Sequence, residues 1–360
     1  MVWSLFQWRH YVTTLKRNTS SLGYAVLVVP FYPVIQSYWI VKHRYLSPIM
    51  HRLLPILILL AATEIAIAHE PESVICGSGS TCEAPHGNGN VYAADIVRRH
   101  GTLLMYYGGQ GRDGHDRIHL ATSTDNKAWK PQGVVFAPEG INHVNDPSVV
   151  IVNGRFYMYY TRASIGVTDC IGLATSTDGR TWLDRGPIIS PREKPAWDTL
   201  LVGRPSVIHD GTKFRMWFDG RADLPTGAPD PEAPKSPTSR RYVGYAESKD
   251  GKSWQRRDEF VFANDAGGVH VSVVDGRYVM LIESRDGTKW ASSNDGISWK
   301  DRGLLVSKDL GTSPYGHVTP FLFTDAKNHV LYFGAAHSEH WNQNSIMRVT
   351  VSSLANAKER

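Results

Sequence analysis

From about Val91 onward, short apolar or alternating runs are separated by Asn-Gly, Asp-Gly and other glycine-containing turns. Runs of this kind predict antiparallel β-strands that are connected by tight hairpins. The clearest unit begins at Asp146 and ends at Trp182, and its runs read DPSVVIV, FYMYYTR and IGLATSTDGRTW. We interpret each such unit as four short strands.

The unit recurs along the chain. Four copies carry a tryptophan after the same turn, at Trp129, Trp182, Trp254 and Trp299, and a divergent last copy begins at His317. Four-stranded units at this spacing are typical of propeller blades. We therefore predict an all-β fold, a five-bladed β-propeller of four-stranded antiparallel blades that occupies residues 91–360.

The residues before the propeller have the layout of a secretory leader. A short basic start at Met50 precedes an apolar core, Leu53–Ala62, and an Ala-x-Ala cleavage signal that ends at Ala68. We expect residues 1–49 to be a mis-assigned upstream extension, residues 50–68 a signal peptide and residues 69–90 an N-terminal segment of a mature chain that begins at His69. The rival interpretation is a membrane span over Leu22–Val41, which contains two prolines.

Charge and cysteine content refine this picture. The net charge is +5, but no block of Lys and Arg indicates a nucleic-acid-binding arm. In an oxidising compartment Cys76 and Cys82 are predicted to form a small disulfide, and Cys170 to be a buried hydrophobe. We expect a secreted or periplasmic monomer with no stable membrane anchor after processing.

Polar residues separate into two faces of the predicted propeller. The Asp-Gly turns at Asp178, Asp250 and Asp295 lie on the lower face, where we interpret them as structural. Unusual polar residues fall on the upper face, at the starts of first strands and the ends of second strands. They are Asp95, Asp146, Arg204, His270 and His317, and then Arg112, Arg162, Asp219, Arg221, Glu283, Arg285 and His337.

At Asn145–Val150 and Ile171–Trp182 the sequence resembles the five-bladed propeller glycosidases, the clan of glycoside hydrolase families 32, 43, 68, 117 and 130. The resemblance extends from about Val91 to Val351. It implies a carbohydrate substrate and acid/base catalysis by carboxylates, with no required cofactor. The stretch that begins with Gly316-His317 is similar to the last blade of family 43. This similarity implies that His317 lies near a metal ion, with a structural Ca²⁺ by the central channel.

The resemblance also suggests catalytic residues. Asp95 and Asp146 match the first two acids of the clan, the base and the modulator of the pKa of the acid, in either order. The Glu-Gly-Pro motif that supplies the general acid is missing. Glu283 ends an apolar run, where desolvation would raise its pKa as a general acid requires, and His270 is the alternative acid.

The remaining upper-face residues are candidates for substrate binding. Arginines that recur after the second strands favour an anionic sugar, although pairing with aspartates of neighbouring blades is the alternative. An insertion over Ala222–Arg241 joins the second and third strands of the third unit. It is either a wall that favours chain ends, and hence exo action, or a disordered surface segment. The alternative functions are a non-catalytic carbohydrate-binding propeller and a sialidase-like hydrolase.

Overall fold

The computed structural model describes residues 70–77, 89–163, 168–228, 230–263, 266–325, 328–351 and 354. The described residues belong to one compact unit, Ala68–Arg360. The expected upstream extension, signal peptide and cleavage site lie outside the described residues. No helix within the described ranges is long and apolar enough to cross a membrane.

This unit is built from strands, and its first three blades are separate four-stranded antiparallel sheets. Blade one contains β2 (Val91–Arg99), β3 (Thr102–Gln110), β4 (Asp116–Ser123) and β5 (Lys130–Phe136). Blade two contains β6 (His143–Val152), β7 (Arg155–Ala163), β8 (Cys170–Ser176) and β9 (Leu183–Ile189). Blade three contains β10 (Leu201–His209), β11 (Phe214–Arg221), β14 (Tyr242–Ser248) and β15 (Gln255–Arg256).

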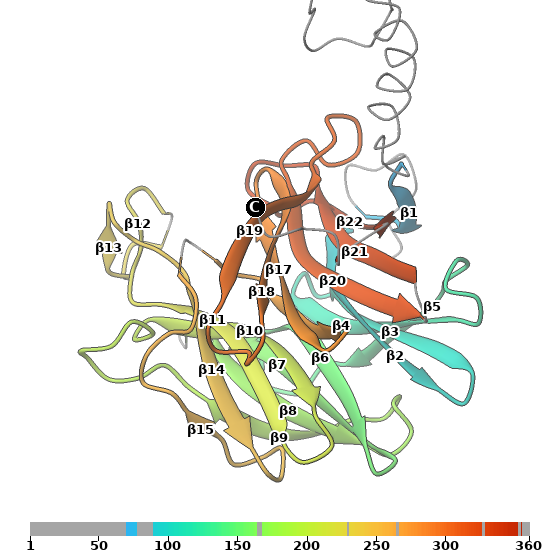
Figure 1. The fold of residues 1–360 in the computed structure, drawn as a ribbon, viewed down its shortest axis with the longest axis horizontal. Helices are drawn as coiled ribbons and strands as arrows, with labels where there is room; N and C mark the ends of the chain where they lie inside the picture. The colour runs from blue at the N-terminus through green and yellow to red at the C-terminus, as the bar shows by residue number, and fades with distance from the viewer. Residues whose placement is uncertain are drawn as a thin grey trace, which may run out of the picture. The chain divides into compact units, whose positions relative to one another are not determined.

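Two further four-stranded units complete the fold. Blade four contains β16 (His270–Val274), β17 (Arg277–Ser284), β18 (Gly287–Ser293) and β19 (Lys300–Ser307). Blade five contains β20 (His317–Asp325), β21 (Asn328–Ala336) and β22 (Asn344–Val351), and its outer strand is β1 (Glu72–Ile75) from the N-terminal segment. The units follow one another in chain order from cyan to red (Figure 1). The predicted all-β architecture of four-stranded antiparallel blades is confirmed.

Five clusters of buried apolar side chains lie between successive blades. One contains Ile96 of β2 and Phe321 of β20, so the last blade packs against the first and the ring is closed. The alternating apolar pattern of the strands produces these interfaces, because one face of each pleated strand turns toward a neighbouring blade. Ile75 of β1 belongs to the same cluster, so the N-terminal segment 69–90 contributes a strand to the propeller.

The innermost strand of each blade contains the same local distortion. One residue has a positive φ at each of five equivalent positions, Ala93, Asp146, Arg204, Gly268 and Thr319. A shift of strand register accompanies it in four of the blades, as expected of a β-bulge. We call these five residues the bulge residues. Because the backbone turns there, the side chain of the bulge residue and that of the residue two positions later lie at different depths along the propeller axis.

In blades one to four, the side chain of the second residue after the bulge accepts or shares a hydrogen bond with the backbone of the next blade. Carboxylate Oδ1 of Asp95 accepts a hydrogen bond from the Val149 N–H at 3.3 Å. The Ser148 hydroxyl accepts one from Val207 at 2.9 Å, and the Ser206 hydroxyl one from Val271 at 2.8 Å. His270 continues the series through a hydrogen bond with the backbone of Leu322. These side chains hold neighbouring inner strands in register.

A second series of bonds uses the Asp-Gly turns of the lower face. Hydroxyls of Tyr106 and Tyr159 donate to the carbonyls of Gly179 and Gly251 in the next blade, at 2.7 and 2.8 Å. The carboxylate of Asp178 accepts from two backbone N–H groups and so fixes its own turn. Asp250 and Asp295 do the same. These contacts support the structural interpretation of the three aspartates.

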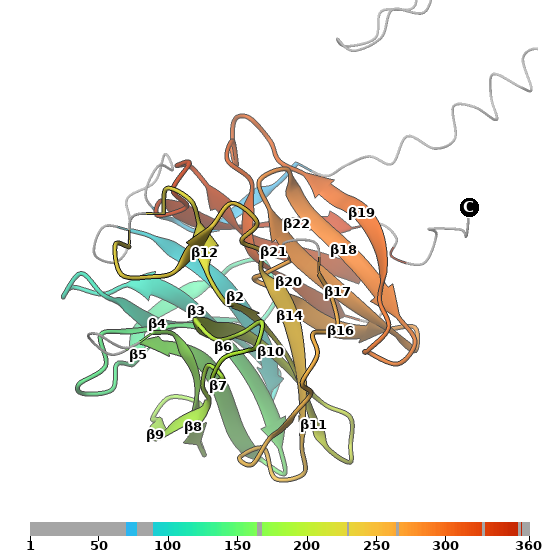
Figure 2. The same cartoon turned by 90° about the vertical axis from the view of Figure 1, so that its left-hand side faces the viewer.

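The insertion in blade three has defined structure. Its described residues include β12 (Leu224–Pro225) and β13 (Lys235–Ser236), which pair in parallel. The segment leaves the propeller at the end of β11 and returns at the start of β14, as predicted for a connection between second and third strands. Figure 2 shows it as the yellow loop that carries β12 above β10 and β14. Disorder of the whole insertion, the alternative interpretation, does not describe this segment.

Candidate active site

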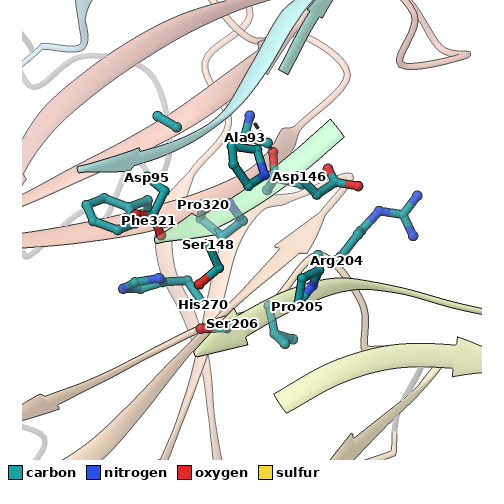
Figure 3. Close-up of a pocket in the computed structure, with 15 residues that line it drawn as sticks. Ala93, Asp95, Asp146, Ser148, Arg204, Pro205, Ser206, His270, Pro320 and Phe321 are labelled. Carbon is teal, nitrogen blue, oxygen red and sulfur yellow. Dashed lines mark hydrogen bonds between the residues drawn. The ribbon is translucent and has the colours of Figure 1, made fainter. Parts of the chain in front are cut away.

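The five inner strands enclose a narrow cavity of ≈ 30 Å³ on the propeller axis (Figure 3). Each blade contributes its bulge residue and the two residues that follow. A cavity of this volume holds about one water molecule. A sugar ring therefore has no room among the inner strands, and a substrate has to bind at the mouth, where the bulge residues lie.

The structure corrects the expected equivalence of Asp95 and Asp146. Asp146 is a bulge residue, whereas Ala93 is the bulge residue of blade one. Asp95 lies two residues further along β2 and bonds the next blade instead. Burial raises the pKa of Asp95 to about 8. Both strands, β2 and β6, contain the same bulge, and Asp95 is equivalent to Ser148 rather than to Asp146. An alignment of strand starts cannot detect this offset of two residues.

His270 also occupies a position two residues after a bulge. Its ring packs against the Phe321 ring with centroids 4.3 Å apart. Burial lowers the pKa of His270 to about 3, so the imidazole is neutral at ordinary pH. A neutral imidazole is a poor general acid, and this environment argues against the alternative acid suggested by the sequence.

Charged side chains from three blades gather at the mouth of the cavity. Arg204 donates to Oδ2 of Asp219 at 2.8 Å, and Arg241 forms an ion pair with Glu283. Asp219 and Glu283 occupy equivalent positions on the second strands of their blades. Each lies two residues after the residue that pairs with the inner strand just past the bulge, which is Trp217 in blade three and Leu281 in blade four. We call the group the carboxylate–guanidinium cluster: Asp146, Arg204, Asp219, Arg241 and Glu283.

Glu283 is buried but ionised. Burial alone would raise its pKa, but Arg241 and Arg204 lower it, and the net shift is downward. Its Oε2 also accepts a hydrogen bond of 3.0 Å from the Thr319 N–H. Desolvation was expected to make Glu283 a general acid. The two guanidinium groups outweigh the desolvation, so the pKa of Glu283 shifts in the direction opposite to the one expected.

A glycine makes room for this carboxylate. Gly268 is the bulge residue of blade four, and a Cβ atom built there would overlap the Glu283 carboxylate. Its φ of 53° is also unfavourable for a residue with a side chain. Gly268 therefore allows Glu283 to reach the mouth of the cavity.

Asp146 shows the opposite shift. Burial raises its pKa to about 7, although Arg204 and a hydrogen bond with Thr161 lower it in part. Its Oδ1 atom is buried and has no hydrogen-bond partner among the described residues. Asp146 and Arg204 lie together on one side of the cavity lining, and Asp95, His270 and Phe321 lie on the other side (Figure 3). The cluster thus combines a carboxyl that protonates near neutrality with one that stays ionised.

Several residues of the site were not predicted from the sequence. The Tyr92 hydroxyl donates to Asp116 at 2.7 Å and accepts from the Asn145 amide at 2.9 Å. Burial, with the charges of Asp116 and Asp146, raises the pKa of Tyr92 well above its ordinary value. The sequence offered one signal for this group of residues, which is that Asn145 directly precedes the candidate Asp146. Arg241 was regarded only as the end of the insertion.

The structure does not bring the rim arginines together. Arg162 pairs with Asp184 of its own blade at 3.4 Å. Arg285 donates to the Glu339 carbonyl at 3.0 Å and lies over the Trp341 ring. Arg112 is exposed in the turn before β4. Pairing with local partners, the alternative that the sequence left open, describes Arg162 and Arg285.

The last two candidates on the upper face, Arg221 and His337, also contact residues of their own blades. The backbone of Arg221 pairs with Leu201 at the edge of blade three. His337 shares a hydrogen bond of 3.2 Å with the Ser345 hydroxyl, and burial lowers its pKa. Neither residue belongs to the carboxylate–guanidinium cluster as we define it.

His317 lies in an environment that does not fit a metal ion. Its Nδ1 lies 2.9 Å from the Thr288 hydroxyl and its Nε2 lies 3.2 Å from the Ser313 hydroxyl. The ring stacks on Phe333 with centroids 3.8 Å apart. Within the described ranges, no group of three or more His, Cys, Asp or Glu side chains could hold a metal ion. The residues around His317 therefore supply no ligand set for the expected calcium ion.

Comparison with known proteins places the fold. No protein-family model matches the chain. Two uncharacterized proteins of Mycobacterium tuberculosis, MT1551 and Rv1502, are 27% identical to it over 183 residues, which is 45% of this chain and 57% of each relative. The match thus spans little more than half the length of these relatives.

Solved structures of glycoside hydrolases resemble the chain more extensively. BT0996, in a complex with RGII, has a TM-score of 0.62 at 21% identity, over 81% of this protein and 95% of that one. Zg3597, a family 117 glycoside hydrolase from Zobellia galactanivorans, has a TM-score of 0.58 at 16% identity, over 80% and 91%. An exo-1,5-α-L-arabinanase from a bovine ruminal metagenomic library has a TM-score of 0.53 at 16% identity, over 75% of this protein and 95% of that one. The chain has the fold of these propeller glycoside hydrolases, as its sequence resemblance indicated.

Proposed function

We propose that the protein is a glycoside hydrolase in which Asp146 is the general acid and Glu283 the ionised carboxylate. One observation carries this proposal: the two carboxyl groups of one cluster have pKa values that are shifted in opposite directions. Glycosidases need one protonated and one ionised carboxyl on either side of the scissile bond. This assignment reverses the roles expected from the sequence, where Glu283 was the acid.

The other residues of the cluster support these two states. Protonated Asp146 donates its proton to the glycosidic oxygen as the bond to the leaving sugar breaks. On the opposite side of the sugar, Glu283 either takes a proton from the water whose oxygen bonds to the anomeric carbon, or itself bonds to that carbon until water hydrolyses the bond. Arg241 keeps this buried carboxylate ionised. Arg204 is held by Asp219 and remains close enough to Asp146 to lower its pKa in part.

Exo action on chain ends is the mode we propose. The insertion returns to the propeller at Arg241, whose guanidinium contacts Glu283. A structured segment that is anchored on the cluster forms a wall on the side of blade three. The narrow axial cavity gives a polymer no route through the ring. Such a site accepts the end of a sugar chain, because the chain cannot continue past the wall or through the ring.

The proposed substrate is a neutral oligosaccharide. The cluster contains two guanidinium groups, and each is paired with a carboxylate of the same cluster. An anionic sugar, the alternative suggested by the sequence, would have to displace these partners. Arabinan-type oligosaccharides are the first substrates to test, because one of the solved structures of this fold is an exo-1,5-α-L-arabinanase.

Export of the protein is also proposed, as a secreted or periplasmic monomer that begins at His69. Cys76 is disulfide-bonded and Cys170 is free. The predicted partner, Cys82, lies outside the described residues. A disulfide supports an oxidising compartment. N-terminal sequencing of exported protein and size-exclusion chromatography test these points, and a mature product that retains residues 1–49 would contradict the first.

Substitution of the two carboxyls tests the function. Asp146→Asn and Glu283→Gln are each expected to reduce turnover of a neutral glycan panel at least a hundredfold, since general acid catalysis contributes about 10²–10⁴. Binding of the same glycans should persist in both variants. Asp325→Asn is the matched control, because Asp325 pairs with Arg98 on the exposed surface. Full turnover in both cluster variants, or binding without turnover in the wild type, would reject the proposal, and the second result would favour a carbohydrate-binding propeller.

A further inference from the structure

A second cavity, of ≈ 580 Å³, lies between two loops of blade three. One loop, residues 190–200, connects β9 to β10, and the other, which follows Arg256, connects β15 to β16. Both loops run from an outer strand to the next inner strand, so they lie on the same face as the carboxylate–guanidinium cluster. The volume falls within the range of about 300–1,000 Å³ that small-molecule sites occupy. It is much larger than the axial cavity.

The walls of this cavity are held in place by polar contacts, of which those of Asp198 are buried. Asp198 is fully buried and pairs with Arg192 at 2.8 Å and with Arg256 at 3.2 Å. Arg192 also donates to Asp258 at 3.1 Å, and the Trp197 indole N–H donates to the Asp258 carbonyl at 3.0 Å. The two loops are therefore bonded to each other across the cavity, and a ligand would meet a site that is already formed.

An aromatic ring and two carboxylates remain for a ligand. Phe260 is 43% exposed, and one side of its ring packs on Tyr242. Trp197 is less available, because its ring already contacts Phe218 and Arg192. Glu193 and Glu259 line the same cavity, and within the described ranges no ion pair or hydrogen bond engages their side chains.

We propose that this cavity is a second carbohydrate-binding site, one that takes a neutral oligosaccharide. Ionised carboxylates only accept hydrogen bonds, so they require a ligand that is rich in hydroxyl or other donors. The apolar C–H face of a sugar ring packs on an exposed aromatic side chain such as Phe260. A sugar acid would bring its own negative charge against Glu193 and Glu259 and is therefore excluded.

The position of the cavity relates it to the cluster. Gly220 directly follows Asp219 in β11, and a Cβ atom built on it would lie 2.9 Å from the Trp197 ring and 3.1 Å from Asp198. The wall of the cavity thus packs against the strand end that carries a cluster carboxylate. The class of ligand rests on the proposed function, but the existence of the cavity does not.

Calorimetric titration in the Asp146→Asn background tests the proposal without hydrolysis. The probes are arabinan oligosaccharides and, as acidic counterparts of equal length, oligogalacturonates. Phe260→Ala is expected to weaken binding of the neutral probe about twofold to twelvefold, since aromatic contacts contribute about 0.5–1.5 kcal/mol. Leu183→Ala, which truncates an exposed side chain of β9 outside the cavity, should have no effect.

Two further variants separate folding from binding. Phe260→Tyr keeps the ring and should bind as the parent does, and melting temperatures show whether Phe260→Ala remains folded. The double variant Glu193→Gln with Glu259→Gln should keep the neutral affinity within about twofold and gain affinity for the oligogalacturonate. Equal affinities of Phe260→Ala and Leu183→Ala, or tighter binding of the acidic probe by the parent, would overturn the proposal. Absence of turnover in the wild type would reject the proposed hydrolase but would leave these titrations interpretable.

Discussion

Five residues with positive φ determine which side chains reach the mouth of the axial cavity. Only Gly268 adopts this conformation without steric cost, and Thr319 is β-branched, for which it is rare. Hydrogen bonds compensate at this residue: the Thr319 N–H donates to Glu283 and its hydroxyl accepts from Ala93 at 2.9 Å. Backbone strain of this kind gathers at functional sites. At Asp146 and Arg204 it brings two charged groups of the cluster to the mouth.

The protonation of Asp146 predicts the alkaline side of the activity profile. A general acid is active while protonated, and burial raises the pKa of this carboxyl to about 7. The kcat/KM for an aryl glycoside is therefore expected to fall about tenfold per pH unit well above pH 7. A pH–rate profile of the wild type provides the measurement. Constant activity up to pH 9 would exclude Asp146 as the acid.

Arg241 predicts the acidic side of the same profile. Its guanidinium is the first charge that lowers the pKa of Glu283. Arg241→Ala leaves this carboxylate buried without its partner, so the pKa of Glu283 should rise and the acidic limb should move to higher pH. Arg162→Ala is the control, because Arg162 pairs with Asp184 away from the cluster. An identical acidic limb in Arg241→Ala and in the wild type would contradict this prediction.

Asp95 predicts a pH dependence of stability. Its folded-state pKa of about 8 exceeds the ordinary value of 3.8, so its contribution to stability is complete below about pH 4 and is lost as the pH rises toward 8. Asp95→Asn keeps an acceptor for the Val149 N–H and removes the titration. Melting temperatures at pH 5 and pH 8 should therefore differ less in the variant than in the wild type. An equal difference in both proteins would show that Asp95 does not titrate in this way.

At the scale of strands and turns, side chains of the second strands join successive blades. Tyr106, Tyr159 and Trp217 each donate to a glycine carbonyl in the Asp-Gly turn of the next blade. Tyr332 of the last blade donates to Asn126 of the first at 2.8 Å. Leu281 fills the equivalent position of blade four and has no donor. There the two sheets are joined instead by the pairing of Ser284 with His317.

Removal of one of these donors should destabilise the propeller measurably. Tyr159→Phe leaves the buried Gly251 carbonyl without this partner, at an expected cost of about 1 kcal/mol in the free energy of unfolding. Urea denaturation provides the measurement. Tyr157→Phe is the matched control on the same strand, where no hydroxyl hydrogen bond is present among the described residues. Equal midpoints for the two variants would show that the contact contributes nothing.

The strands and turns could be predicted from the sequence, whereas the site could be predicted only in part. Alternating apolar residues and Asp-Gly pairs are local signals, and both were interpreted correctly. Asp95 and Asp146 differ by two residues in their position relative to the bulge that both strands share, and the local signal of this offset is the Pro147 that follows Asp146. The partner of Glu283 is 42 residues away, at the end of an insertion. Long-range pairs of this kind follow from the closed ring rather than from any motif.

At the scale of the whole molecule, the N-terminal strand completes the last blade. β1 pairs with β22, Ile75 is 2% exposed, and Arg348 donates to Glu72 at 3.0 Å. A chain that begins at His69 should therefore be as stable as the full chain. One that begins after Ile75 should lose about 2–3 kcal/mol, the contribution expected from one buried isoleucine, before any loss of strand pairing. Thermal unfolding of the two truncated chains tests this, and equal melting temperatures would show that β1 is dispensable.

The pairing of β1 with β22 also orders events during synthesis. Glu72 and Arg348 are 276 residues apart in sequence. During synthesis β1 therefore cannot pair until β22, the last of the described strands, has also been made. Until then β1 offers a row of unpaired backbone groups, and blades one to four can form without it. Closure of the ring is consequently a highly non-local step, and pairings of this kind form slowly in general. If the chain is exported unfolded, this step has to take place after translocation, when both ends of the propeller are on the same side of the membrane.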